Sequence, residues 1–118
     1  MVKEEKSFSY KIEGGVLEIK LGGEIDHHSA VRVRADIDGI IFEQRPRRVI
    51  LDLSEISFMD SSGLGLIMGR YTLIKDFGGV LILRSPTAAV MRILTLAGME
   101  RMIGIEKASK EEVTNEEK

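Results

Sequence analysis

Cysteine is absent from this sequence, and tryptophan is absent too. Without cysteine the chain can form no disulfide framework, no thiolate nucleophile and no Cys-ligated zinc or iron–sulfur site, which fits a reducing compartment. No apolar run approaches the length of about 20 residues that a membrane helix needs. Residues 1–6 carry too many charges to start a signal peptide. We therefore expect a cytoplasmic protein that has no membrane partner.

An excess of positive charge is also missing. The chain has 17 basic and 19 acidic residues, a net charge of -2, and aromatic residues make up only 5% of it. Such a balance gives no electrostatic footprint for a phosphate backbone, and so few aromatic rings argue against a surface that stacks on bases. The composition predicts no direct contact with nucleic acid.

The chain of 118 residues is long enough for one domain with one core. Apolar residues alternate with polar ones on both sides of Gly14-Gly15, which predicts a β-hairpin. Farther on, helical and strand-like spacings alternate, and Ser85 and Pro86 are expected to cap and begin the last helix, which Gly98 ends. The expected strands are 8–12, 16–21, 48–53, 80–83 and a short one within 102–105, and the expected helices are 29–43, 64–78 and 86–97.

This alternation of strands and helices predicts a single α/β domain. We expect a mainly parallel β-sheet that has an N-terminal hairpin and helices packed against it. The domain should span residues 8–107, after a flexible N-terminus at 1–7. Residues 108–118 form a polar, charged tail in which Ser109 and Glu112 have the spacing of a cap for a short final helix.

Residues 57–71 are the most unusual segment, because two adjacent serines and three glycines open a helix there. Asp60, Ser61 or Ser62 should be its N-cap, a role worth about 1 kcal/mol. A cap does not explain Gly65 and Gly69, each of which costs about 1 kcal/mol relative to alanine inside a helix. Two explanations stay open: close helix packing, or a flat apolar face for a partner formed with Leu64, Leu66, Ile67 and Met68.

Enzymatic interpretations of this segment are weak. A phosphate-binding Walker loop would need Gly-Lys-Ser/Thr, whereas Gly69 is followed by Arg70-Tyr71. A dinucleotide site would need an acidic residue after the next strand, and Arg84 stands there. Ser61 lies outside the Gly-x-Ser-x-Gly pattern of hydrolases. The sequence therefore predicts no cofactor.

Residues 22–30 form a second strand-to-helix transition, with Asp26 or Ser29 as the expected cap. His27 and His28 could complete a catalytic triad with Ser61 only if the fold brings them together, and side chains of adjacent residues diverge too much to share a zinc ion. We expect no metal site. In a parallel sheet, however, this loop should lie beside the helix that follows Asp60.

Taken together, four blocks of this sequence closely resemble the STAS family over residues 8–107. They are Gly-Glu-Ile-Asp-His-His-Ser-Ala at 23–30, Ser-Phe-Met-Asp-Ser-Ser-Gly-Leu-Gly at 57–65, Gly-Arg-Tyr at 69–71 and Gly-Gly at 78–79. Within the family, the Asp-His-His block is similar to the anti-sigma factor antagonists, in particular those of the sporulation sigma F pathway.

The resemblance implies a binding switch and not an enzyme. Family members bind an anti-sigma factor that is also a serine kinase, with ADP or ATP bound, and thereby release the sigma factor. Phosphorylation of the first serine after the Asp, here Ser61, stops binding, and a serine phosphatase reverses it; Ser62 is then the expected cap. The residues that the resemblance implies in partner binding are Glu24, Asp26, His27, Asp60, Ser62, Gly63 and Leu64.

Two alternatives remain from the sequence. The first is an antagonist with the same fold that serves a different sigma-pathway kinase, of the stress-response type. The second is a small serine-based or nucleotide-dependent enzyme.

Overall fold

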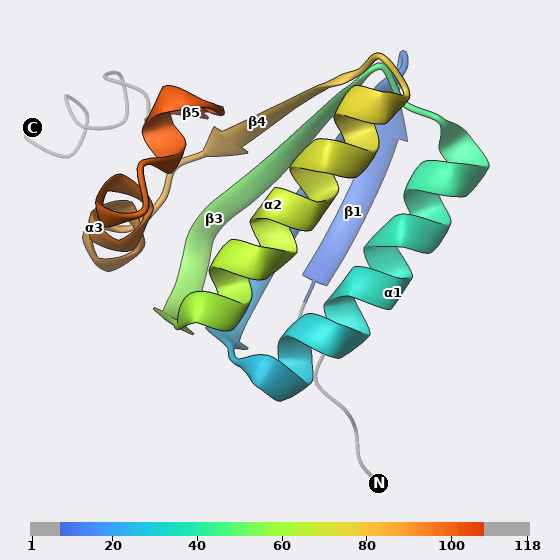
Figure 1. Cartoon of the computed structure of the whole chain (residues 1–118). Helices are drawn as coiled ribbons and strands as arrows, with labels where there is room; N and C mark the ends of the chain where they lie inside the picture. Colours follow the sequence, from blue (N-terminus) through green and yellow to red (C-terminus); the bar gives the residue numbers. More distant parts are fainter. Residues whose placement is uncertain (1–7, 108–118) are drawn as a thin grey trace, which may run out of the picture.

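The computed structural model describes residues 8–107, which form one five-stranded sheet with three α-helices (Figure 1). The strands lie in the order β1-β2-β3-β4-β5; β1 is antiparallel to β2 and every other neighbouring pair is parallel. The expected α/β fold is confirmed. The elements are β1 (Phe8–Glu13), β2 (Val16–Ile25), α1 (His27–Gln44), β3 (Arg48–Met59), α2 (Ser61–Asp76), β4 (Val80–Arg84), α3 (Ala88–Leu96), the 3-10 turn η1 (Met99–Arg101) and β5 (Gly104–Glu106).

The predicted hairpin is present, and Gly14 and Gly15 form its turn with positive φ angles of 61° and 81°. The turn aligns Phe8 with Leu21 and Ile12 with Leu17 across the two strands. Its geometry is of the kind that glycine adopts without steric cost.

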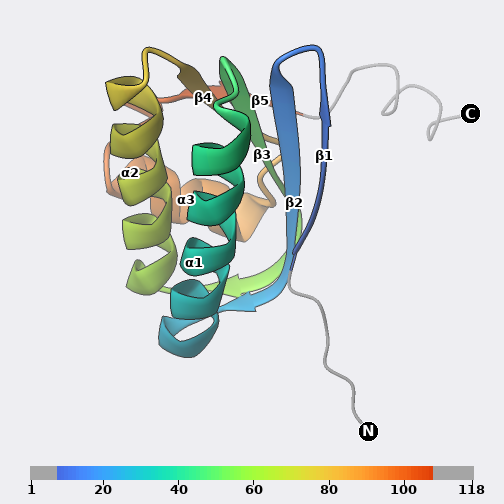
Figure 2. The same cartoon turned by 90° about the vertical axis from the view of Figure 1, so that its right-hand side faces the viewer.

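The helices lie on one face of the sheet, and no helix of the described residues covers the other face, which is called the open face below (Figure 2). Fully buried side chains of the strands and helices fill the space between the layers, among them Leu17, Ile19, Leu51, Ile37 and Ile67. This core fixes where α1 and α2 lie, and therefore where both helices begin.

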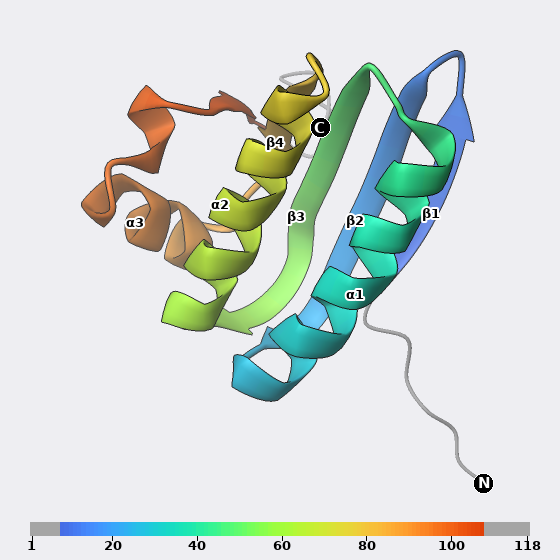
Figure 3. The same cartoon turned by 45° about the vertical axis from the view of Figure 1, so that its right-hand side comes forward.

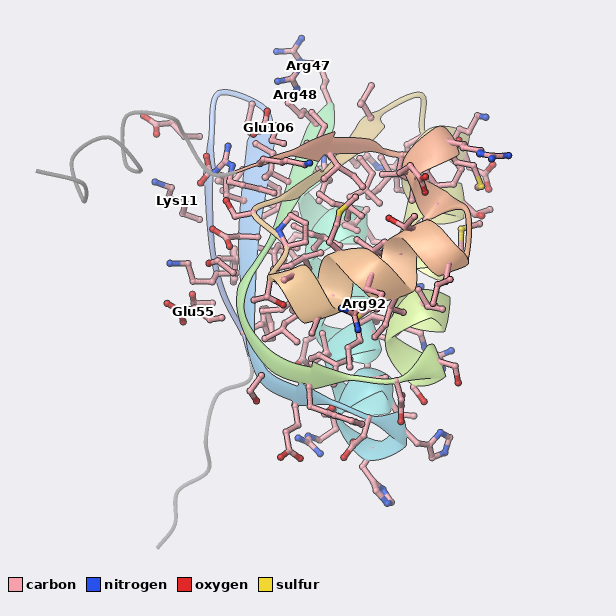
Figure 4. The ribbon with its side chains drawn as sticks, turned by 90° about the vertical axis from the view of Figure 1, so that its left-hand side faces the viewer. Lys11, Arg47, Arg48, Glu55, Arg92 and Glu106 are labelled. Carbon is pink, nitrogen blue, oxygen red and sulfur yellow. The ribbon has the colours of Figure 1, made fainter. Side chains whose placement is uncertain are left out.

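The open face of the sheet carries charged side chains that pair across strands. Arg84 Nη1 lies 3.5 Å from Glu18 Oε1, and Arg84 Nε lies 3.2 Å from Glu106 Oε1. Lys11 and Glu55, which Figure 4 shows at this side of the molecule, pair with Glu18 and Lys20 at 4.0 and 3.7 Å. Ion pairs that are exposed to this extent contribute little to stability.

Two strands run farther than the sequence predicts. β2 continues to Ile25 and β3 continues to Met59, beyond the expected ends at residues 21 and 53. The pairing passes two register shifts, after Lys20 and after Gly23, and Gly23 has a positive φ of 74°. These irregularities break the alternation of apolar residues from which the strand ends were predicted. The extra length curves β3 beneath the start of α2 (Figure 3).

The predicted start of the third helix is wrong. Thr87, not Ser85, is the N-cap of α3, and its hydroxyl accepts the N–H of Val90 at 3.2 Å. Ser85 has a left-handed backbone with φ 53°, and its N–H donates to Glu106 O. The bond to β5 holds Ser85 at the sheet edge, so the helix begins two residues later than expected.

Among residues 8–107, no helix is both long and apolar enough to cross a membrane. The predicted flexible segment 1–7 and the charged tail 108–118, with its expected cap at Ser109 and Glu112, lie outside the described residues.

Candidate functional site at the starts of α1 and α2

The ends of β2 and β3 lie side by side and bring the two strand-to-helix transitions together. Ile25 pairs with Met59, and Glu24 pairs with Phe58. The N–H of Asp60 also donates to Ile25 O at 3.3 Å. Asp26 and Asp60 therefore follow neighbouring strands at one edge of the sheet, as the sequence predicts, and α1 and α2 start next to each other (Figure 3).

Asp60 is the N-cap of α2. Its carboxylate accepts the N–H of Ser62 at 2.8 Å, and its extended backbone, with φ -113°, ends the strand. The expectation that Ser62 is the cap is therefore wrong, because β3 extends to Met59 and places Asp60 at the boundary. Ser61 is the first helical residue and is exposed, whereas Ser62 is half-buried.

Asp26 caps α1 in the same way, which settles the choice between Asp26 and Ser29. The Ser29 N–H donates to Asp26 Oδ1 at 3.0 Å, and the Asp26 N–H donates to Ser29 Oγ at 2.9 Å, so the two residues form a capping box. The backbone N–H of Ser29 is the main reason that the pKa of Asp26 lies below its ordinary value of 3.8. Asp26 is thus a carboxylate at neutral pH, held at the start of a helix.

A further bond ties Glu24 to this start. Ser29 Oγ donates to Glu24 O at 2.8 Å, while the side chain of Glu24 is exposed. Glu24, Asp26 and Asp60 thus lie at the ends of two neighbouring strands, where α1 and α2 begin, and these three residues are called the acidic rim below.

The glycines of α2 have different surroundings. A Cβ atom on Gly63 would collide with the side chain of Met59 and would touch Ile25 Cγ2 at 3.4 Å. Nothing lies within 4 Å of the Cβ position at Gly65 or at Gly69. Close packing therefore explains why residue 63 is a glycine. As an explanation for Gly65 and Gly69, close packing is wrong.

The apolar face predicted for α2 is only partly present. Leu66 and Ile67 are 4% and 1% exposed and belong to the core, so their assignment to a partner face is wrong. Leu64 and Met68 are half-buried and pack at the border of the core. Leu64 thus remains beside Ser61 as the apolar residue of the predicted partner surface.

A groove of about 270 Å³ runs between the first turns of α1 and α2. On the α1 side it is lined by His27, Ala30, Val31 and Arg34, and on the α2 side it is lined by Ser62, Gly65 and Leu66. Sequence analysis missed Val31 and Arg34, although the spacing of residues 27, 30, 31 and 34 is that of one helix face.

Within residues 8–107, no side-chain hydrogen bond joins His27 or His28 to Ser61. Both histidines are exposed at the start of α1 with ring centres 5.8 Å apart, and His27 lines the groove. Among residues 8–107, no group of three or more His, Asp or Glu side chains is placed to hold a metal ion.

Beyond the groove, an ion pair joins the two helices. Arg70 Nε lies 2.9 Å from Asp38 Oδ1, and only 7% of the Arg70 side chain is exposed. Burial lowers the pKa of the Arg70 guanidinium, while the Asp38 carboxylate raises it and the charge of Arg34 lowers it. The effect of Arg34 on this pKa indicates that the positive charge of Arg34 lies near that of Arg70.

Comparisons with known proteins agree with this geometry. The profile of the STAS domain family matches residues 7–112. The anti-sigma F factor antagonist of Paenibacillus polymyxa is 40% identical over 91 residues, which cover 77% of this chain and 78% of that protein. The anti-sigma-B factor antagonist of Bacillus subtilis is 29% identical over 79% of this chain and 84% of its own length.

Solved structures give the same result. The anti-sigma factor antagonist SpoIIAA in its unphosphorylated form superposes with a TM-score of 0.76 at 31% identity, covering 92% of this chain and 94% of that one. The phosphorylated form of the Bacillus cell fate determinant SpoIIAA superposes with a TM-score of 0.71 at 29% identity, covering 94% and 99%. With its profile match, its relatives and this shared fold, the chain belongs to the STAS domain family and to the anti-sigma factor antagonists within it.

Proposed function

We propose that this protein is a phosphorylation-controlled antagonist of an anti-sigma factor that is also a serine kinase. The unphosphorylated form binds the kinase, with ADP or ATP in the kinase's own site, and frees the sigma factor in the cytoplasm. Phosphorylation at Ser61 stops binding, and a serine phosphatase restores it. The observation that carries the proposal is the exposed Ser61 hydroxyl at the first position of α2, directly after the Asp60 cap.

The start of α2 suits a phosphate acceptor. Free backbone N–H groups and the helix dipole favour negative charge at such a position, so a phosphate there need not disturb the fold. The relatives support the same role, since they are named antagonists of anti-sigma factors and SpoIIAA has a phosphorylated form.

The acidic rim explains why the phosphate acts as a switch. Asp60 directly precedes Ser61, Glu24 and Asp26 lie at the end of the neighbouring strand, and a phosphate adds about 1.5 to 2 negative charges. A partner that presses on Leu64 then meets a dianion that it must desolvate, whereas Gly63, the neighbouring predicted contact, is itself buried. A loss of about 1.4 kcal/mol already lowers affinity tenfold.

His27 and Ser62 belong to the same proposed surface, since both line the groove beside Ser61. His27 supplies a donor at the start of α1, and Ser62 forms the floor next to the acceptor.

The test is direct phosphorylation. The protein is incubated with ATP and either the anti-sigma F factor or an anti-sigma-B-type factor from the same organism, and the phosphate is located by mass spectrometry. We expect phosphate on Ser61, none on Ser61→Ala, and normal modification of the matched control Ser62→Ala. Phosphate on Ser62, or none with either kinase, would contradict the proposal.

The second candidate is an antagonist in a stress-response pathway, and the similarity to anti-sigma-B factor antagonists favours it. The two kinase arms of the same experiment separate it from the sigma F partner. A serine-based enzyme would instead hydrolyse ester or nucleotide substrates by itself and lose that activity when His27 and His28 are both changed to Asn.

A further inference from the structure

The groove between α1 and α2 contains a positive charge that no nearby carboxylate is free to neutralise. Arg34 lines the groove and is exposed, and among the ion pairs of residues 8–107 it has no carboxylate partner. At helical spacing its acidic neighbour is Asp38, one turn farther along α1. Asp38 is already held by Arg70 at 2.9 Å. Two guanidinium groups therefore lie near one carboxylate, and a positive charge is left over at the groove.

The walls of the groove are apolar and open. Val31 is 49% exposed, and Ala30 stands beside it on α1. On the other wall, Gly65 has open space where a Cβ would stand. A glycine that costs helix stability and packs against nothing in the described chain leaves room for a visiting side chain.

We propose that this groove binds an acidic side chain of the anti-sigma factor, and that Arg34 is a specificity-determining residue that pairs with it. The inference rests on the proposed function and adds a second contact to it. The acidic rim attracts basic groups of the partner, and Arg34, about two helical turns from Asp26 along α1, attracts a carboxylate. Because the two charges differ in sign, they fix the orientation in which the partner docks.

Arg34 is a suitable residue for this contact. Its planar guanidinium offers a fork of N–H donors that matches a carboxylate in a bidentate pair. The apolar walls partly exclude water from the pair once the groove is filled, which strengthens it relative to an exposed ion pair.

The first test uses charge variants on one helix. Dissociation constants for the ADP-bound anti-sigma factor are measured by calorimetry for wild type, Arg34→Gln, Arg34→Glu and the control Arg32→Gln, an exposed arginine on α1 that does not line the groove. We expect Arg34→Gln to weaken binding about tenfold, Arg34→Glu to weaken it more, and Arg32→Gln to stay within about twofold. Thermal denaturation checks that all four proteins are equally stable.

The second test fills the groove without changing its charge. Gly65→Leu places a side chain where the partner's should lie, and Gly69→Leu is the matched control one turn farther along, outside the groove lining. We expect only Gly65→Leu to weaken binding at least tenfold, with both variants folded.

The outcomes separate this inference from the proposed function. If Ser61 is phosphorylated and wild type binds, but Arg34→Gln and Gly65→Leu bind like wild type, the groove contact is wrong and the switch stands. If wild type binds neither anti-sigma factor, both are overturned. Restoration of Arg34→Glu binding by an Asp or Glu to Lys change in the kinase would identify the partner's carboxylate.

Discussion

At the residue scale, Asp26 is both a helix cap and a charged group of the proposed partner surface. Its carboxylate completes the capping box with Ser29, and the half-buried Asp26 also belongs to the acidic rim. Its lowered pKa, caused chiefly by the Ser29 N–H, keeps it charged for both tasks. A loss of binding after a change here therefore has two possible causes, a loosened helix start or a missing charge.

Two variants of Asp26 separate these causes. Asp26→Ala removes the cap and the charge, and should lower the free energy of unfolding by about 1 kcal/mol and weaken the kinase complex. Asp26→Asn keeps a good capping side chain, so its stability should stay within about 0.5 kcal/mol of wild type while binding weakens and becomes less dependent on salt. Chemical denaturation and calorimetry measure the two quantities. Wild-type affinity of Asp26→Asn would reduce Asp26 to a helix cap.

At the start of α2, the sequence could name the candidates for the cap but could not choose among them. Asp60, Ser61 and Ser62 all carry an oxygen that can accept a nearby helical N–H, so local chemistry permits each. The choice depends on how far β3 pairs with β2, which places Asp60 in an extended backbone. Ser61 is the expected phosphate acceptor only through the family resemblance, since no periodicity distinguishes it from Ser62.

At the scale of elements, the three glycines of α2 lie in different surroundings. Gly63 lets the helix start pack on Met59 at the end of β3. Gly65 faces the groove, and Gly69 has open space at its Cβ position. Only the first of these requirements belongs to the fold itself.

The glycines therefore predict opposite effects of one substitution. Gly63→Ala should lower the free energy of unfolding by about 1 to 3 kcal/mol, because its methyl group overpacks the contact with Met59. Gly65→Ala should raise it by up to about 1 kcal/mol, since alanine has the better helix propensity and its methyl group meets no neighbour. Thermal and urea denaturation of both variants check the pair. A destabilised Gly65→Ala would show that a neighbour occupies the groove in the free protein.

The same scale shows what the sequence can predict. The alternation around Gly14-Gly15 and the helical spacing in α1 and α2 were sufficient to predict the hairpin and the two helices, because those patterns are continuous. The far ends of β2 and β3 were missed because the bulges near Gly23 interrupt the alternation. The start of α3 was missed because the N–H of Ser85 donates to Glu106 O of β5. These residues are far apart in the sequence, so no local pattern indicates the contact.

At the scale of the whole molecule, the proposed switch changes a surface without changing the fold. The face of α2 that holds Ile67 is locked into the core, and Arg70 joins the helix to Asp38 of α1. Ser61 points away from that core, at the helix end where negative charge is favoured. A phosphate can therefore alter the partner surface while leaving the sheet and both helices in place.

This division between fold and surface predicts how two substitutions of similar size should differ. Ser61→Asp adds a negative charge, and Ser61→Asn adds nearly the same volume without it. If charge is the signal, Ser61→Asp should weaken the kinase complex at least tenfold, and Ser61→Asn should weaken it distinctly less. The helix dipole should make Ser61→Asp at least as stable as Ser61→Asn, by up to about 1 kcal/mol. Calorimetry measures the affinity for the kinase, and thermal denaturation measures the stability of each variant. Equal losses of affinity in the two variants would show that the size of the side chain, rather than its charge, prevents binding.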